Sequence, residues 1–392
     1  MDRIYLNRAI EPHLLELSTF FPATVIIGPR QVGKTSLVQA LRNQLAGRSI
    51  YLDLERPTDL AALENFELFT TQNQDAVIIL DEVQRRPGLF TELRSIIDRD
   101  RRPGRFVLLG SASFDLIRDA SETLAGRIAI VELTGLRWSE VTGRIDPVMH
   151  WLRGGFPDAL LAPNNELSLT WRDNFIRTYL ERDLPSYGFR ADPFEMYRTL
   201  AMMGHLSGQL VNVRSLAKST KLGEAQVTRY LNLTEQTFIV RRLPAYHGNV
   251  GKRLVKTPRL FLRDTGLLHA LLTIRDYTDL AKHPIYGASF ETYVVEQVYV
   301  YALRNRLRMY YYRTTNGAEI DIVLERGGQV VAVLEVKATD QPKLTRGFYS
   351  AREALGNPPA FVVCLMDRAP YSFKEGVRVI GIRDLAQALT SV

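Results

Sequence analysis

Short, unbroken apolar runs separate helical patterns in the first part of the chain. The runs lie near residues 24–27, 50–54, 77–80, 105–109 and 128–133, and strands buried on both faces of a parallel sheet have this continuous pattern. Residues 146–204 are mostly helical in pattern, whereas residues 314–339 alternate with a period of two around a turn at 326–328, as a hairpin does. The pattern predicts an α/β protein in four segments: 1–145, 146–204, 205–285 and 286–392.

The first apolar run leads into the sequence GPRQVGKT. Its glycines, lysine and threonine have the spacing of a phosphate-binding P-loop, and a strand before the loop with a helix after it is the context that this motif requires. Backbone amides would hold the α- and β-phosphates, Lys34 would reach the β- and γ-phosphates, and the Thr35 hydroxyl would bind Mg²⁺. The motif predicts ATP and Mg²⁺ as cofactors, held by Gly28, Pro29, Gln31, Val32, Gly33, Lys34, Thr35 and Ser36.

An acidic pair follows the apolar run at 77–80. Asp81 is placed to hold Mg²⁺, directly or through water, as a Walker-B aspartate does. Glu82 is placed to orient and deprotonate the water that attacks the γ-phosphate. Acids often end strands without such a role, but this pair lies downstream of a P-loop. The two motifs together therefore predict a hydrolase rather than only a nucleotide-binding protein.

Two further candidates accompany the next apolar runs. Ser111 or Ser113, after the run at 105–109, would detect the γ-phosphate or would only cap a helix, and we take Ser111 as the sensor. Arg127, before the run at 128–133, would contact phosphate in its own or a neighbouring subunit, as an arginine finger does. The alternative for Arg127 is a solvated charge. A contact with a neighbouring subunit would imply a homo-oligomer, which the sequence leaves open.

Composition narrows the class of protein without identifying its substrate. The chain has 392 residues, 46% of them apolar and 24% charged, which is ordinary for a globular protein of two or three domains. Its start has no charged-then-apolar leader, and no apolar run approaches a membrane-spanning length. We therefore expect a cytoplasmic protein without membrane contact. A single cysteine, Cys364, lies in an apolar run and excludes an internal disulfide, and the six scattered histidines do not indicate a zinc site.

Positive charge is concentrated in one segment. Between residues 205 and 260, ten lysines and arginines face only two glutamates, whereas the whole chain has a net charge of +7. Such a local excess is typical of a surface that meets a polyanion. Two short amphipathic helices, at 213–218 and 224–236, precede two alternating strands around the loop 247–251, which is a winged helix–turn–helix layout. We expect DNA contacts from Gln226, Thr228, Arg229 and Asn232 and, on the wing, Lys252 and Arg253; packing against a protein is the alternative.

The C-terminal hairpin carries a second candidate chemistry. Asp321 lies on its first strand, and Glu335 and Lys337 share one face of its second strand. Asp321 and Glu335 would hold Mg²⁺, while Lys337 would orient the attacking water or stabilise developing charge, as metal-dependent phosphodiester cleavage needs. The helix expected at 288–303 adds Glu291 and Glu296; because these are five residues apart, at most one faces the site, and we take Glu296 as the additional ligand.

The acidic hairpin resembles the restriction-endonuclease-like superfamily with its PD-(D/E)xK motif. Ala318-Glu319-Ile320-Asp321 stands where many members have a Pro-Asp pair. The whole chain resembles a group of prokaryotic proteins that join an AAA-type ATPase to a C-terminal domain of unknown function with an endonuclease-like end. The matching motifs are GPRQVGKT, IILDEVQ, LLGSAS, LAGRI, GGFPDAL, YLERDL, LRDTGL and EIDIV with LEVK. The resemblance implies an AAA/RecA-like parallel sheet, a winged helix–turn–helix region and an α/β endonuclease-like domain.

Three functions are compatible with these features. The first is a Mg²⁺-dependent ATPase that translocates, branch-migrates or remodels DNA, with cleavage by the last domain. The second is an ATP-gated switch whose nuclease-like domain is an inactive platform for DNA or protein. The third is an assembly component with weak turnover. Glu82 favours turnover over pure switching, and the intact triad of Asp321, Glu335 and Lys337 favours cleavage over a platform.

Overall fold

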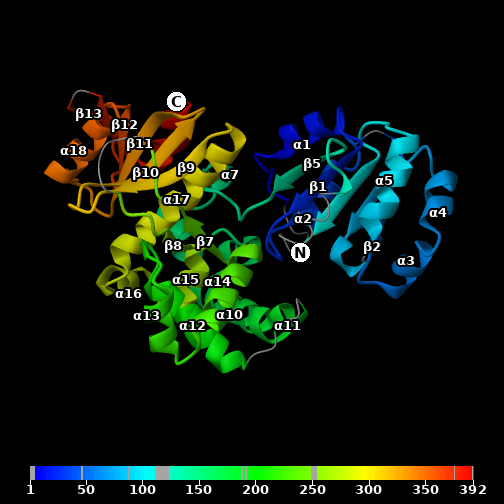
Figure 1. The fold of residues 1–392 in the computed structure, drawn as a ribbon, viewed down its shortest axis with the longest axis horizontal. Helices are drawn as coiled ribbons and strands as arrows, with labels where there is room; N and C mark the ends of the chain where they lie inside the picture. Colours follow the sequence, from blue (N-terminus) through cyan, green and yellow to red (C-terminus); the bar gives the residue numbers. More distant parts are fainter. Residues whose placement is uncertain are drawn as a thin grey trace. The chain divides into compact units, whose positions relative to one another are not determined.

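The computed structural model describes residues 5–45, 47–86, 88–110, 123–186, 189, 192–248, 254–374, 376–390 and 392. Contacts divide the chain into two units, Met1–Leu136 with Gln236–Phe238, and Arg137–Glu235 with Ile239–Val392. In Figure 1 the first unit runs from blue to cyan and the second from green to red. Within the described residues, no helix is long and apolar enough to cross a membrane.

A five-stranded sheet of order β2-β3-β4-β1-β5 forms the first unit. All its pairings are parallel, and the strands are β1 Ala23–Ile27, β2 Ser49–Asp53, β3 Val77–Asp81, β4 Phe106–Gly110 and β5 Ile128–Glu132. The predicted strands are therefore confirmed. β1, β3 and β4 are buried along their whole length, as their unbroken apolar runs indicate.

Helices cover both faces of this sheet. α1 Glu11–Ser18 and α2 Lys34–Leu41 pack on one face, where Leu37 and Val38 meet alternate residues of the strands such as Ile26. α3 Pro57–Ala62, α4 Phe66–Gln72 and α5 Leu89–Arg99 cover the other face, where Phe66 and Leu93 pack with Val25. A short 3-10 turn, η1 Val83–Arg85, follows β3. The layered arrangement is that of a parallel α/β sheet.

The second unit begins with a helical region that matches the expectation for residues 146–204. It consists of α7 Trp138–Val141, α8 Pro147–Arg153, α9 Pro157–Leu160, α10 Asn165–Thr178, the π-helical turn η2 Tyr179–Asp183, α11 Leu184–Ser186 and α12 Pro193–His205. α15 Thr265–Leu271 and α16 Tyr277–Lys282 pack into the same region. Two of the sequence motifs meet there, because Asp264 of LRDTGL accepts a hydrogen bond from the amide of Gly155 in GGFPDAL across 2.7 Å.

A small sheet follows in the basic segment. Its three strands are β6 Gln209–Leu210, β7 Val240–Leu243 and β8 Arg259–Leu262, in the antiparallel order β6-β8-β7. α13 Val213–Thr220 and α14 Glu224–Gln236 connect β6 to β7. The two predicted helices and the two strands after them are present.

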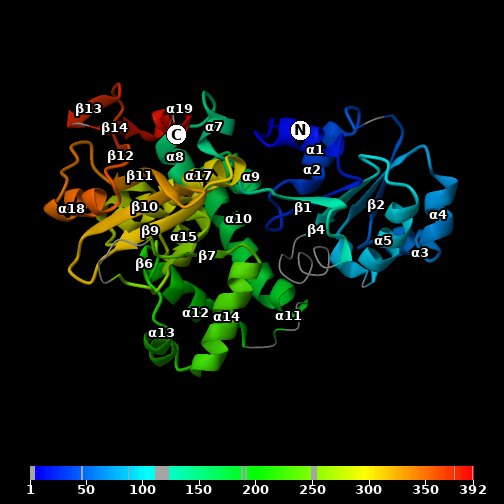
Figure 2. The same cartoon turned by 45° about the horizontal axis from the view of Figure 1, so that its top comes forward.

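A six-stranded mixed sheet of order β13-β14-β12-β11-β10-β9 forms the rest of the second unit. The elements are α17 Tyr286–Arg304, β9 Arg308–Arg313, β10 Glu319–Arg326, β11 Gln329–Lys337, α18 Arg346–Ala354, β12 Ala360–Cys364, β13 Tyr371–Lys374, β14 Val377–Gly381, η3 Ile382–Asp384 and α19 Leu385–Leu389. β9, β10 and β11 are antiparallel, and β12 runs parallel to β11. α17 and α18 flank the sheet (Figure 2), with Val294 and Phe348 in separate cores. Cys364 is buried and free, as predicted.

Candidate functional sites

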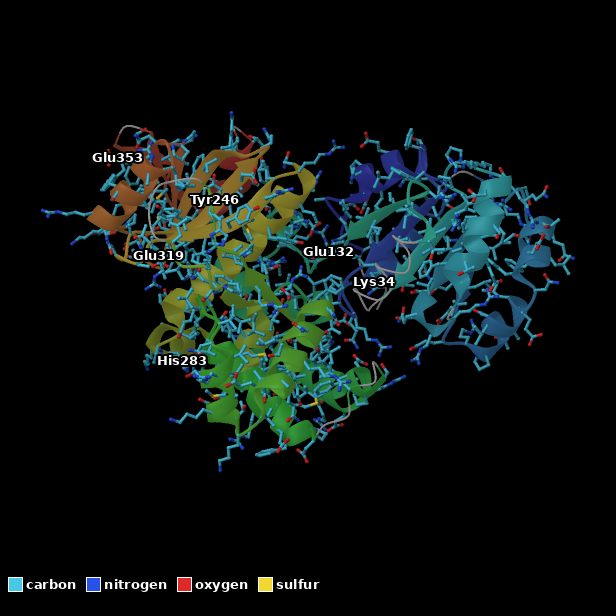
Figure 3. All side chains as sticks on the ribbon, in the orientation of Figure 1. Lys34, Glu132, Tyr246, His283, Glu319 and Glu353 are labelled. Carbon is cyan, nitrogen blue, oxygen red and sulfur yellow. The ribbon has the colours of Figure 1, made fainter. Side chains whose placement is uncertain are left out.

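The P-loop and the acidic pair come together at one edge of the first unit's sheet. β1 ends at Ile27, immediately before the loop, and β3 ends at Asp81. Because all strands are parallel, their carboxyl ends share an edge, where ligands of such sheets bind. Figure 3 marks Lys34 at this edge and Glu319 in the second unit. The topology therefore places the predicted nucleotide residues in one site.

The loop has a backbone shape that depends on glycine. Gly28 has φ 153° and Gly33 has φ 97°, and Gln31 also has a positive φ of 59°. A Cβ atom on Gly28 would lie 2.2 Å from the carbonyl oxygen of Leu133. α2 begins directly after Gly33, so its free amides point toward the loop. This is the geometry of a backbone cradle for phosphate.

The Lys34 side chain lies within the loop. Its Nζ donates to the carbonyl oxygens of Gly28 at 3.0 Å and Pro29 at 2.8 Å. Burial lowers the pKa of Lys34 to about 8, although the charges of Glu82 and Asp81 oppose this shift. A buried ammonium held only by neutral carbonyls gains more from an anionic partner than from these carbonyls. Lys34 is thus suited to a phosphate oxygen.

Asp81 is the centre of the predicted metal site. Its Oδ2 accepts hydrogen bonds from the Thr35 hydroxyl at 2.6 Å and from the Tyr51 hydroxyl at 2.7 Å, and its Oδ1 accepts from the Glu82 amide at 2.9 Å. A threonine hydroxyl beside a carboxylate is an oxygen donor set that suits Mg²⁺, which keeps several waters and phosphate oxygens as its other ligands. Thr35 and Asp81 therefore fit the ion.

Glu82 adopts an uncommon backbone conformation. It has φ 54° and ψ 45° and begins the turn η1, and such a left-handed conformation costs free energy for a residue other than glycine. The Gln84 side chain donates to its carboxylate. The strained backbone places a partly exposed carboxylate directly after Asp81, as the general-base prediction requires.

Two residues that hold the site were missed from the sequence. Tyr51 lies on β2 and binds Asp81, and Arg8 donates to the carbonyl oxygens of Val32 at 3.2 Å and Thr134 at 2.7 Å. Arg8 is buried and links the P-loop to the end of β5. Tyr51 could have been expected near Asp81, because β2 is the neighbour of β3 in such sheets. Nothing in the sequence near Arg8 indicates its role.

The assignment of Arg127 as a phosphate contact within its own subunit is wrong. Arg127 precedes β5, and its carbonyl accepts from the amide of Ala23 at the start of β1. It therefore lies at the amino edge of the sheet, opposite the P-loop. Its guanidinium binds both carboxylate oxygens of Asp98, at 2.7 and 2.9 Å. The other candidate at this site, Ser111, falls outside the described residues.

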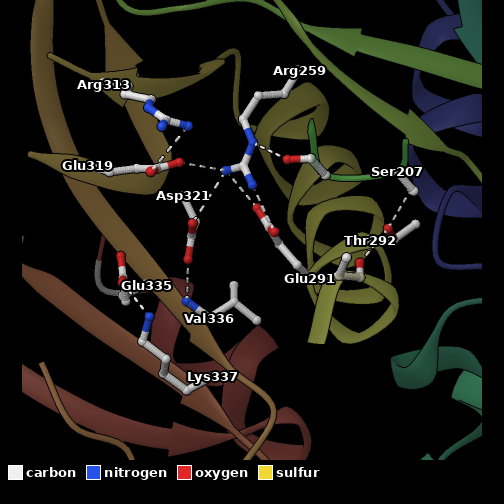
Figure 4. Close-up of polar contacts among 12 residues, drawn as sticks. Ser207, Arg259, Glu291, Thr292, Arg313, Glu319, Asp321, Glu335, Val336 and Lys337 are labelled. Atoms are coloured by element: carbon white, nitrogen blue, oxygen red, sulfur yellow. Dashed lines mark hydrogen bonds and ion pairs between the residues drawn. The ribbon is translucent and has the colours of Figure 1, made fainter. Parts of the chain in front are cut away.

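The hairpin residues of the second unit do come together (Figure 4). Asp321 Oδ2 accepts a hydrogen bond from the Val336 amide at 2.9 Å, and Lys337 Nζ donates to Glu335 Oε1 at 2.7 Å. Burial and the charge of Asp321 raise the pKa of Glu335. The predicted triad therefore exists as a cluster on β10 and β11.

Besides Lys337, the cluster contains a second cation, Arg259, that was not predicted from the sequence. Arg259 on β8 is buried and binds Glu291 through NH1 at 2.7 Å and NH2 at 2.9 Å, and it contacts Asp321 Oδ1 at 3.3 Å. A more distant ion pair joins it to Glu319 at 3.5 Å. Although burial disfavours its charge, Glu291, Asp321 and Glu319 raise the pKa of Arg259 above its ordinary value.

Glu296 is not a member of this cluster, so its prediction as a metal ligand is wrong. Its carboxylate binds the guanidinium of Arg241 and pairs with Arg263 at 3.5 Å. Five residues on a helix turn the side chain well away from the direction of Glu291. Glu291 is the α17 carboxylate that joins the cluster.

The residues of the cluster do not fit a divalent ion as they stand. In the part of the chain that the structure describes, no three histidine, cysteine or acidic side chains could hold a metal together. Asp321 and Glu335 each have one oxygen occupied by a hydrogen bond, and Arg259 stands between Asp321 and Glu291. Asp321, Glu335 and Lys337 therefore show the predicted proximity without a metal site.

The face of α14 predicted to meet DNA is exposed. Gln226, Thr228, Arg229 and Asn232 are exposed, whereas Val227, Tyr230 and Leu231 are buried. The Arg229 guanidinium lies over the ring of Phe189, 4.9 Å from its centre. Lys252 and Arg253, the predicted wing residues, fall outside the described residues.

The positive charge of this segment is smaller than its sequence indicates. Arg241 pairs with Glu296 and Arg259 with Glu291, and both acids lie outside residues 205–260. Arg242 binds Glu235 within the segment. Exposed positive charge in the described part of the segment is supplied by Arg214, Lys218, Lys221, Arg229 and Lys256.

Comparison with known proteins agrees with the first unit's site. Residues 21–142 match an AAA domain, and residues 146–278 and 286–385 match two domains of unknown function, DUF8612 and DUF4143. The uncharacterized protein Rv2008c of Mycobacterium tuberculosis and the uncharacterized protein Mb2031c of Mycobacterium bovis are each 40% identical over 333 residues, 84% of this chain and 73% of theirs.

Similar solved structures are more distant. The Walker-type ATPase PABY2304 of Pyrococcus abyssi is 17% identical with a TM-score of 0.47, covering 68% of this chain and 96% of that one. The Holliday junction branch migration motor RuvB of Thermotoga maritima is 18% identical with a TM-score of 0.31, covering 61% and 90%. The family assignment rests on sequence: the chain is an AAA-type ATP-binding protein and belongs to the same family as the two mycobacterial proteins.

Proposed function

We propose that this protein is a Mg²⁺-dependent ATPase that acts on DNA. The observation that carries the proposal is the joint placement of Lys34, Thr35 and Asp81, with Glu82 next to them, at the carboxyl edge of the sheet. Thr35 and Asp81 would hold Mg²⁺, which would supply positive charge against the phosphates.

The chain's own residues would perform the remaining tasks. Lys34 would leave the carbonyls of Gly28 and Pro29 and turn to the phosphates, because an anion is the stronger partner. Thr35 and Asp81 would hold the ion through oxygen atoms. Glu82 would orient the attacking water and accept its proton.

Support for DNA as the partner comes from the second unit. The order α12, β6, α13, α14, β7, β8 with sheet order β6-β8-β7 supports the interpretation as a winged helix–turn–helix module, in which the second helix of the pair would read the major groove. α14 presents Gln226 and Arg229, and α13 and its end present Lys218 and Lys221. Positively charged side chains bind the phosphates of DNA whatever the DNA sequence is.

The element order of the C-terminal part supports its interpretation as a restriction-endonuclease-like core. α17, three antiparallel strands, α18 and a fourth strand parallel to the third carry Asp321, Glu335 and Lys337. One observation favours a second candidate function, in which this domain is an inactive platform and ATP gates binding: Arg259 already supplies the positive charge of the carboxylate cluster.

An ATPase assay with single-stranded, duplex and branched DNA tests the proposal. Hydrolysis should depend on Mg²⁺ and be stimulated by at least one DNA form. Lys34→Ala should abolish hydrolysis and weaken ATP binding strongly, whereas Glu82→Gln should keep ATP bound and lose turnover. A wild-type rate of ATP hydrolysis in Glu82→Gln would contradict its assignment as the general base. A rate of hydrolysis that no DNA form changes would favour the second candidate function, the ATP-gated platform.

A further inference from the structure

Three carboxylates contact one buried guanidinium in the second unit, and a fourth belongs to the same cluster. Arg259 reaches from β8 to Glu291 of α17 and to Glu319 and Asp321 of β10, while Glu335 of β11 pairs with Lys337 (Figure 4). β8 belongs to the three-stranded sheet of the basic segment, not to the sheet that carries the carboxylates. One module therefore inserts a fixed positive charge into the acidic site of the next.

We propose that Arg259 takes the place of a divalent cation in this nuclease-like cluster, so that the site stays free of metal, and that removing Arg259 opens a latent site for Mg²⁺ or Mn²⁺ at Asp321, Glu291 and Glu335. The proposal uses the endonuclease-like interpretation of the C-terminal domain but is independent of ATP hydrolysis.

The contacts of Arg259 fix it in place. Its Nε donates to the carbonyl oxygen of Gly208 at 2.6 Å, and its two terminal nitrogens bind the two oxygens of Glu291 at 2.7 and 2.9 Å. Phe261 and Tyr311 lie 5.5 and 5.8 Å from the guanidinium carbon. A guanidinium stays charged at any pH a protein tolerates, so the cluster always contains this cation.

Electrostatics makes the guanidinium and a metal ion mutually exclusive. A metal bound to Asp321 and Glu291 would lie within a few ångströms of NH1, because NH1 contacts both carboxylates, at 3.3 and 2.7 Å. Two positive charges a few ångströms apart in a buried site repel each other, and the repulsion is larger for a divalent ion than for a single charge. Arginine and metal therefore compete for the same oxygens.

The remaining carboxylate oxygens show that the site retains capacity for a cation. Glu335 is 7% exposed, and its Oε2 has no hydrogen-bond partner among the described residues. A buried carboxylate oxygen without a donor is costly unless a proton or a cation joins it. Without Arg259, Asp321 and Glu291 would face the same cost, and oxygen ligands in this number suit Mg²⁺ or Mn²⁺.

The test counts bound Mn²⁺ by electron paramagnetic resonance on the full chain without nucleotide. An Asp81→Asn background removes the Mg²⁺ ligand of the first unit. With Arg259 intact, Asp321→Asn should change neither the amount of bound Mn²⁺ nor the shift in melting temperature that Mn²⁺ causes. Arg259→Ala should bind one further Mn²⁺ per chain and gain several degrees of melting temperature with it, and Asp321→Asn should abolish both effects.

Arg241→Ala is the matched control, because it also removes an arginine, here a partly buried one, that pairs with a glutamate of α17, Glu296. It should create no Mn²⁺ site that depends on Asp321. Mn²⁺ binding that depends on Asp321 while Arg259 is present would overturn the proposal, as would a folded Arg259→Ala protein that binds no additional Mn²⁺. If Arg259→Ala does not fold, the comparison of Asp321→Asn with its parent, both with Arg259 present, still tests whether the cluster excludes metal. Arg259→Lys keeps the positive charge and should bind no additional Mn²⁺.

Discussion

The hydroxyl of Tyr51 donates a hydrogen bond to Oδ2 of Asp81 across 2.7 Å, on the same oxygen that accepts from Thr35. Tyr51 lies on β2, directly beside β3, which ends in Asp81. Burial and the neighbouring Asp81 raise the pKa of Tyr51 above its ordinary value, so the phenol stays a donor. Tyr51 therefore orients the carboxylate that we expect to hold the metal.

Tyr51→Phe should raise the Mg²⁺ concentration that ATP hydrolysis requires. A hydrogen bond to a charged group contributes about 1.5–3 kcal/mol, but Thr35 and the Glu82 amide still hold Asp81, so we expect about a tenfold rise in the Mg²⁺ concentration for half-maximal rate. Tyr5→Phe is the control, since it removes a similar bond to Glu11 at 2.7 Å. An unchanged Mg²⁺ titration in Tyr51→Phe would exclude the positioning role.

DNA affinity should depend on the exposed lysines and arginine of the helix pair. Replacing Lys218, Lys221 and Arg229 together with alanine should lower affinity and reduce the slope of log K against log salt by about 0.9 for each phosphate that the protein no longer neutralises. The control replaces Arg304, Arg306 and Arg308, which are exposed elsewhere in the same unit and carry equal charge. Equal losses of affinity in both triple variants would mean that net charge, not this surface, determines binding.

The sequence predicted local elements well because their signals are local. The five strands of the first unit and the helix pair appear where apolar runs and amphipathic patterns place them. The errors concern relationships across the chain. Counting charge along the segment could not reveal that Arg241 and Arg259 pair with Glu296 and Glu291 from α17.

For Arg127, strand direction alone could have excluded a phosphate contact within its own subunit, whereas a contact with a neighbouring subunit stays a prediction. A residue before a parallel strand lies at the edge opposite a loop that follows one. The choice between Glu291 and Glu296 instead needed the rotation of α17 against the sheet, which packing decides. The motifs GGFPDAL and LRDTGL had no predicted role, and the structure gives them one in packing.

Acid should destabilise the second unit through His269. Its Nδ1 contacts the Leu152 carbonyl at 2.8 Å and its Nε2 the Ser289 hydroxyl at 2.7 Å, with Trp151 donating to that hydroxyl. Burial lowers the pKa of His269 to about 3 from 6.5. Between these two pKa values His269 is protonated in the unfolded state but not in the folded state. The free energy of unfolding therefore falls as the pH drops from about 6.5 toward about 3, by up to about 1.4 kcal/mol per pH unit.

His269→Gln should remove this part of the pH dependence, although it costs stability at pH 7. The three tryptophans, Trp138, Trp151 and Trp171, all lie in the second unit, so their fluorescence in urea reports its unfolding selectively. His205→Gln, an exposed histidine of α12, serves as the comparison. If His269→Gln and wild type lose stability in parallel between pH 7 and 5, His269 does not carry the effect.

Gly266→Ala should destabilise the second unit strongly, because two motifs interlock at this residue. A Cβ atom on Gly266 would lie 2.0 Å from the carbonyl oxygen of Arg153 and 3.0 Å from Cδ of the buried Arg172. The first contact is with backbone, so α8 and α15 must separate, and overpacking of this kind costs about 3 kcal/mol. Gly287→Ala is the matched control, since α17 leaves open space around its Cβ; there, alanine should stabilise by about 0.4–1 kcal/mol. Tryptophan fluorescence in urea should show a lower free energy of unfolding for Gly266→Ala and a higher one for Gly287→Ala. A small loss of stability in Gly266→Ala would mean that α8 and α15 can move apart without cost.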